Sequence, residues 1–264
     1  MEDDSQSLPA LPVPAPSLEG RMPGQSVAEE VLRQCAAAPR RSGAAWLFGA
    51  SPLPPDSRSW FSGALGEMAV GRALAGLGPE WTVLHAVPVG AGSSDIDHVV
   101  LGPGGVFTVN TKRHAGQKVW VGGNTFLVAG KRREHLRNAR FEGRRAGRLL
   151  SVAVRGAVPV TAVVAVVGAR PLTIKGQADG VLALDAAGPA ADPAADPAAG
   201  PAADPAADPA ADPAAVGSEF EALRLRVRRA GMRRAAWGLA VFAAVFTPVV
   251  PAGLSEVLRL FGAG

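Results

Sequence analysis

The pattern of apolar positions divides the middle of the chain into segments of two kinds. Three segments repeat apolar residues every three or four positions, which predicts helices; they are residues 26–38, 63–77 and 134–152. Seven segments are alternating or β-branched runs, which predicts strands; they are residues 81–89, 96–101, 106–112, 118–121, 125–128, 158–167 and 180–185. Together they predict an α/β fold with one mixed sheet flanked by helices.

Two of these strands form a hairpin around the Gly-Pro-Gly-Gly run at residues 102–105. A four-residue turn there places Asp97 opposite Asn110 and Asp95 opposite Lys112. Facing residues point to the same side of a sheet, so we expect these four polar side chains to share one face. The residues predicted on the other face are Ile96, His98, Val100, Phe107 and Val109. His98 is therefore predicted to be a hydrogen-bonded core histidine.

An acidic residue interrupts the apolar stripe of the helix at residues 63–77. Glu67 lies three and seven positions before Val70 and Leu74, so it should face the sheet with them. A buried carboxylate is costly unless a hydrogen bond or a positive charge compensates it. We expect a metal ion to provide that charge.

These side chains have the chemistry that phosphodiester hydrolysis needs. Mg²⁺ or Mn²⁺ would take oxygen ligands from Asp97, Glu67 and the amide of Asn110. Such an ion lowers the pKa of a bound water and stabilises charge on the phosphate. Lys112 is expected to orient that water or to contact the phosphate. No small-molecule cofactor is expected.

The same segments resemble the nuclease-related domain, NERD. The resemblance rests on Gly66-Glu67, on the run from Ile96 to Phe107 with its Ile-Asp-His-Val sequence and glycine-rich turn, and on Thr111-Lys112. It covers about residues 62–150. It implies a core similar to the restriction-endonuclease-like superfamily, a metal-dependent nuclease activity and frequent occurrence in bacteria. By this resemblance Glu67, Asp97 and Lys112 match the helix acid, the first metal acid and the catalytic lysine.

The chain departs from the family pattern at Asn110, where an acid is expected two residues before the lysine. An amide oxygen can bind a hard cation but brings no charge, so metal affinity should fall. Two interpretations stay open. One is an active nuclease in which Asp95 supplies a compensating carboxylate. The other is a catalytically inactive module that binds nucleic acid or serves as a scaffold.

Positive charge is concentrated in the second half of the predicted domain. Residues 112–155 contain twelve Lys and Arg but two Glu. The arginines at helical spacing form a predicted ridge: Arg133, Arg137, Arg140, Arg144 and Arg148. Such a ridge would follow a DNA or RNA backbone, and a solubilising face is the alternative. The single cysteine, Cys35, excludes an internal disulfide and a zinc site of paired cysteines.

The flanking sequence differs in composition from this domain at residues 60–186. Residues 1–59 are Pro-rich and predicted to be mostly disordered, apart from the helix near 26–38. Residues 187–217 repeat Pro-Ala-Ala, which predicts an extended spacer. Residues 218–234 are Arg-rich, and residues 235–254 carry no charge. That length predicts one transmembrane helix, with the domain cytoplasmic because the arginines precede it; a buried hairpin of the domain is the alternative.

Overall fold

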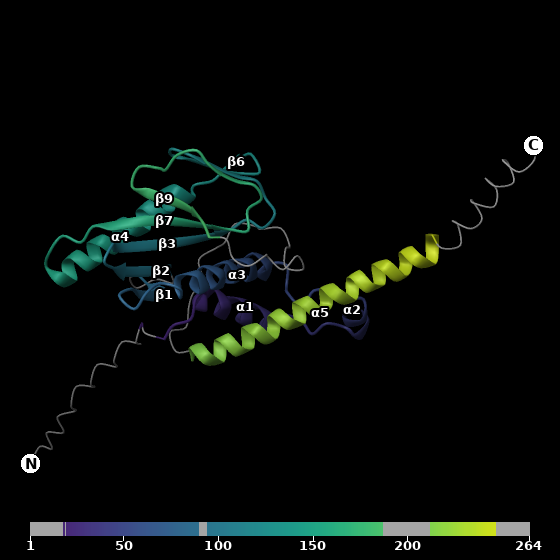
Figure 1. Cartoon of the computed structure of the whole chain (residues 1–264). Helices are drawn as coiled ribbons and strands as arrows, with labels where there is room; N and C mark the ends of the chain where they lie inside the picture. The colour runs from purple at the N-terminus through teal and green to yellow at the C-terminus, as the bar shows by residue number, and fades with distance from the viewer. Residues whose placement is uncertain (1–17, 19, 90–93, 187–211, 247–264) are drawn as a thin grey trace, which may run out of the picture.

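The computed structural model of the chain describes residue 18 and residues 20–89, 94–186 and 212–246. At its centre is a five-stranded sheet (Figure 1). Its strands, in spatial order, are β1 (Thr82–Pro88), β2 (Asp95–Gly102), β3 (Gly105–Arg113), β7 (Val160–Val167) and β9 (Val181–Asp185). β1, β2 and β3 are antiparallel neighbours, whereas β3, β7 and β9 run parallel.

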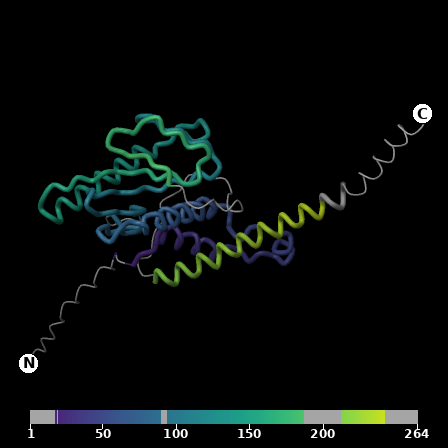
Figure 2. The backbone as a smooth tube through the Cα atoms, in the orientation of Figure 1, coloured from purple at the N-terminus to yellow at the C-terminus, as the bar shows by residue number. Residues whose placement is uncertain are grey.

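Helices cover both faces of this sheet. The helices are α1 (Gln25–Ala37), α2 (Gly43–Leu47), α3 (Ser57–Leu74), α4 (His135–Val154) and α5 (Pro213–Phe246). α3 packs on one face and α4 on the other, and α1 and α5 lie beyond α3 (Figures 1 and 2). The predicted α/β class is therefore confirmed. α3 begins six residues before its predicted start, since Pro54 and Pro55 precede the first turn, where proline is compatible with a helix.

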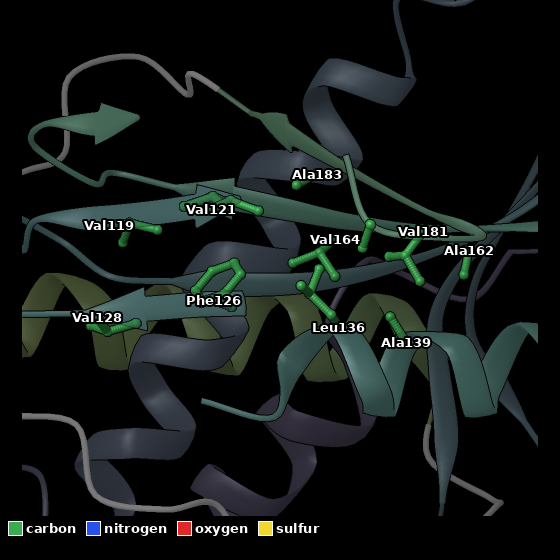
Figure 3. Close-up of a cluster of buried hydrophobic side chains, with 12 residues drawn as sticks. Val119, Val121, Phe126, Val128, Leu136, Ala139, Ala162, Val164, Val181 and Ala183 are labelled. Carbon is green, nitrogen blue, oxygen red and sulfur yellow. The ribbon is translucent and has the colours of Figure 1, made fainter. Parts of the chain in front are cut away.

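The prediction of a single mixed sheet is wrong. A second sheet has the strand order β6 (Lys131–Arg132), β5 (Thr125–Val128), β4 (Val119–Gly122) and β8 (Leu172–Ile174). Its apolar side chains pack face to face against β7 and β9, next to α4 (Figure 3). Those side chains are Val119, Val121, Phe126 and Val128, all nearly inaccessible to solvent. The hairpin thus buries its apolar face against the main sheet instead of extending its edge.

β7 has the predicted environment of a central strand. Ala162, Val164 and Val166 contribute to the core that the second sheet and α4 close. The alternate residues Val163, Ala165 and Val167 contribute to the core under α3. Because both faces are covered, a β-branched run without polar positions is what this strand requires.

α5 passes without a break through the Arg-rich segment and into the charge-free segment. Its first part packs through Val216, Phe220 and Leu223 into a core shared with α1 and α3. Further along, the indole Nε1 of Trp237 donates to the carbonyl oxygen of Leu47 at 2.9 Å. The last five positions of the predicted spacer, residues 213–217, are therefore helical. None of the helices in the described ranges is long and apolar enough to span a bilayer. The predicted transmembrane segment is described only as far as Phe246.

Candidate functional site

β2 and β3 have the predicted register as far as the pair His98–Val109. Beyond that pair, the backbone N–H of Thr111 donates to a carboxylate oxygen of Asp97 at 2.6 Å. A side chain thus accepts a bond that the ladder would otherwise make. This bond holds the carboxylate of Asp97 against the strand that carries Asn110.

All five residues predicted on the apolar face of the hairpin are buried or partly buried, and four of them lie on the expected face. Val100, Phe107 and Val109 belong to the core under α3. His98 is fully buried, and its Nδ1 lies 2.8 Å from Nδ1 of His85, which confirms a hydrogen-bonded core histidine. The placement of Ile96 is wrong, because it packs with Val99 and Ala146 on the α4 side. The predicted alternation holds only while β2 stays paired with β3.

Glu67 faces the sheet from α3, as predicted, and only 6% of it is exposed. The residue before it explains how the helix comes so close to β3. A Cβ atom on Gly66 would lie 3.0 Å from Cβ of Arg113 and 3.2 Å from Cγ2 of Thr111. Because Gly66 has no side chain, α3 can pack close to β3, and Glu67 then lies near the end of that strand.

Burial raises the pKa of the acids at this end of the sheet. Burial raises the pKa of Glu67 well above its ordinary value, and the charges of Asp97 and Asp95 raise it further, while Lys112 lowers it. Burial also raises the pKa of Asp97, opposed by the charge of Lys112 and by hydrogen bonds from Thr111. Burial raises the pKa of Asp95 to about 6. The structure therefore brings together Glu67, Asp97 and Lys112.

Glu142 of α4 joins this group, and it was not among the predicted site residues. The amide Nδ2 of Asn110 donates to both carboxylate oxygens of Glu142, at 2.7 and 2.8 Å. Burial raises the pKa of Glu142 to about 7, and the charge of Asp97 raises it too, while the bond from Asn110 lowers it. A signal was present in the sequence, because Glu142 is the only acid within α4. The arginines around Glu142 in α4 drew attention to the positive charge of the helix instead.

The segment before α3 also reaches the site. The side chain of Ser26, at the start of α1, hydrogen-bonds to Asp95, and Arg21 in turn donates to the hydroxyl of Ser26 at 3.1 Å. At the site itself, two buried oxygens have no hydrogen-bond partner among the described residues, Oδ2 of Asp95 and Oδ1 of Asn110. Both are acceptors that point to a missing donor or cation.

The arginines of the predicted ridge have different surroundings. Arg133 precedes the first residue of α4, and Arg137 lies 3.4 Å from the carboxylate of Glu134. Arg144 and Arg148 are exposed on the helix surface. The ridge therefore remains a prediction.

Arg140 is held in place by hydrogen bonds. Its Nε donates to the carbonyl oxygen of Asp179 at 3.0 Å and its Nη2 to the side chain of Asn124 at 2.8 Å. It lines a cavity of about 510 Å³ with Gly143 and Arg144. Arg140 thus ties α4 to the neighbouring loops and is less available than Arg144.

The site does not form a ready cage of acidic ligands. Within the part of the chain that the structure describes, no three Asp, Glu, His or Cys side chains lie close enough together to hold a metal ion. The carboxylates are close enough to shift each other's pKa, but Asn110 occupies the central position with a neutral amide. An ion here would need the amide oxygen as one of its ligands.

The fold and the side chains define an α/β protein with a cluster of carboxylates, an amide and a lysine at one end of the main sheet. The family model of the nuclease-related domain, NERD, matches residues 62–167, from within α3 to the last residue of β7. The chain thus contains a NERD domain, as the motifs around Glu67, Asp97 and Lys112 indicated. No curated protein and no solved structure matches the chain significantly.

Proposed function

We propose that this site hydrolyses phosphodiester bonds of DNA or RNA with the help of a divalent metal ion, Mg²⁺ or Mn²⁺. The observation that carries the proposal is the meeting of Glu67, Asp97 and Lys112 at one end of β3, inside the NERD domain. Asn110, on the same strand, binds Glu142, whose pKa the charge of Asp97 raises. Burial and mutual repulsion make such a cluster costly for stability alone. Clusters of perturbed carboxylates with a cation beside them are typical of functional sites.

The donors present suit a hard cation. Asp95 and Asn110 each have a buried oxygen without a hydrogen-bond partner in the described ranges, and the nearby carboxyl groups have raised pKa values. A divalent ion would lower those pKa values. Glu67, Asp97 and Asn110 would hold it through the oxygen ligands that Mg²⁺ prefers. When bound, the ion would lower the pKa of a water and stabilise charge on the phosphate.

Two further side chains of the chain have roles in this proposal. The positive charge of Lys112 lowers the pKa of both Glu67 and Asp97, so its ammonium group is near enough to contact a phosphate oxygen beside them. Glu142, whose pKa burial raises to about 7, holds a proton for part of the time at neutral pH. It can therefore exchange a proton with a reacting oxygen. Its carboxylate replaces the charge that Asn110 lacks.

The test uses the purified full chain with linear and circular DNA and with RNA, in Mg²⁺, Mn²⁺ or chelator. We expect metal-dependent cleavage that Asp97→Asn and Lys112→Ala each reduce by about 100-fold or more, the range found when a group that stabilises the transition state is removed. The matched control is Glu80→Gln, an exposed acid before β1, which should cleave like the wild type. Cleavage that survives both site variants would rule out this assignment of the catalytic residues.

One observation favours a second candidate function, binding without cleavage. Both oxygens of Glu142 accept from the amide of Asn110, a pairing that forms without a metal ion. In that case the basic helix would bind nucleic acid and the cluster would only stabilise its position. Tight binding of DNA or RNA without cleavage in any metal would support this candidate.

We also propose that residues 235–254 attach the protein to a membrane, with the NERD domain on the cytoplasmic side. The support is their charge-free sequence, the arginines that precede it, and the exposure of Leu239 and Val241 on α5, which are 70% and 58% accessible. Alkaline carbonate should leave the protein in the membrane fraction of the cells that make it. Release of the intact protein would contradict attachment through this segment.

A further inference from the structure

A cavity opens beside Glu142, between α4 and the segments at the end of β1 and the start of β2. Its volume is about 380 Å³, within the range of small-molecule pockets, and it is lined by Val89, Ser94, Ile96, Phe141, Glu142 and Arg145, among others. Glu142 forms part of this wall and also binds Asn110. The cavity therefore leads from the surface to the carboxylate cluster.

The aromatic side chain of Phe141 lines the cavity and is largely exposed. Phe141 is 60% exposed, although its neighbour Glu142 is largely buried by Asn110 and the sheet. Single exposed apolar residues are common on protein surfaces. Phe141 differs because positively charged residues of the same helix lie one turn before and after it, Arg137 and Arg145, and all three line the cavity.

Arg145 is fixed at this wall. Its Nη2 donates to the carbonyl oxygen of Val89 at 2.7 Å. A guanidinium group has five N–H donors, so this bond leaves others for a phosphate. Arg137 lies further out on the surface, where it is 76% exposed. A flat apolar ring between two guanidinium groups is the combination that binds a base by stacking and its phosphates by charge.

We infer that this cavity binds a single-stranded segment of nucleic acid, with an unpaired base stacked on Phe141 and flanking phosphates on Arg137 and Arg145. In a duplex the bases are stacked on each other and their faces are not available to Phe141. A cavity of this size takes about one nucleotide, which would place the next phosphate beside Glu142. The inference rests on the proposed function, because it names the substrate of the same site.

The experiment measures binding without cleavage. The full chain, in mild detergent and with chelator, is titrated into a short fluorescent single strand and into the matching duplex, and anisotropy is recorded. We expect the single strand to bind about tenfold more tightly than the duplex, because only unpaired bases can stack on an aromatic side chain. Phe141→Ala should weaken single-strand binding about tenfold and leave duplex binding unchanged, whereas Phe141→Trp should keep it.

The matched control is Val152→Ala, an exposed apolar residue of α4 that is 79% accessible and lies away from the cavity. It should bind both ligands like the wild type. Equal affinity for single strand and duplex, binding of neither, or wild-type binding by Phe141→Ala would overturn the inference. Since chelator prevents metal-dependent cleavage, selective single-strand binding by a chain that never cuts would support the inference and refute the proposed hydrolysis.

Discussion

The two helices that bring an acid to β3 are packed in opposite ways. α3 is covered on its outer side by α1 and α5, and Phe61 of α3 lies 5.2 Å from Phe220 of α5 between ring centroids. α4 has an open outer side, where Phe141, Leu149 and Val152 are exposed. Glu67 is therefore a buried internal group, whereas Glu142 lines a cavity at the surface. A substrate would therefore approach from the α4 side.

The largest expected effect concerns the closed side. Phe61→Ala removes a side chain that is 1% exposed and should lower the free energy of unfolding by about 3–5 kcal/mol, as measured with urea. Phe141→Ala, the same change on the open side, should cost less than about 0.5 kcal/mol. Similar losses for both variants would show that the two sides are not packed differently.

The next prediction concerns the amide of Asn110, which donates to Glu142. Asn110→Asp puts a carboxylate against Glu142 and should lower stability without metal by about 2 kcal/mol, because a hydrogen bond becomes a repulsion. Mg²⁺ should then raise the melting temperature of this variant more than that of the wild type. Asn138→Asp, on the exposed surface of α4, is the control. If Mg²⁺ leaves the melting temperature of Asn110→Asp unchanged, the proposed ligand role of this position is contradicted.

A smaller effect is expected from the pKa of Glu142. Because its pKa rises from 4.5 to about 7 on folding, the folded chain binds more protons than the unfolded chain between those pH values, and stability falls as pH rises through that window. Glu142→Gln has no carboxyl group to titrate and does not lose this stability. Its free energy of unfolding relative to the wild type should therefore be about 1–2 kcal/mol higher at about pH 8 than at about pH 5. Thermal unfolding at both pH values measures this, with Glu80→Gln as the control. A gain that is equal at the two pH values would disprove the raised pKa.

The smallest expected effect concerns the exposed arginines of the open side. Arg144→Gln together with Arg148→Gln should weaken binding of nucleic acid a few-fold and reduce the salt dependence, by a slope of about 0.7–0.9 for each phosphate that the protein no longer neutralises. Lys118→Gln, an exposed cation directly before β4, should leave the slope unchanged. An unaltered slope in the double variant would leave the ridge as a solubilising surface.

Local patterns were enough to predict the elements around the site. The β-branched run predicted β7. The turn at residues 102–105 predicted β2, β3 and their register, because a shift of one residue would bury polar side chains. The stripe that contains Glu67, Val70 and Leu74 predicted which face of α3 meets the sheet. These features depend on neighbours in the chain.

What could not be predicted depends on contacts between distant segments. The bond between Asn110 and Glu142 joins residues 32 positions apart, and no periodicity indicates it. The second sheet could not be foreseen because a hairpin sequence does not specify whether it pairs with an edge or packs on a face. The end of the ladder after His98 depends on the side chain of Asp97, which competes with the backbone for Thr111.

Because α5 packs on α1 and α3, the choice of boundaries for a recombinant fragment of this protein is restricted. Residues 62–167 match the family, but Phe61, Phe220 and Leu223 share one core, and Ser26 reaches Asp95. A recombinant fragment of residues 62–167 would lack both the shared core and the bond from Ser26 to Asp95. Conversely, a chain nicked at a protease site engineered into residues 187–211 should stay together as two fragments. Residues 62–167 thus match the family, while α1 and α5, which lie outside that range, complete the core on which α3 packs.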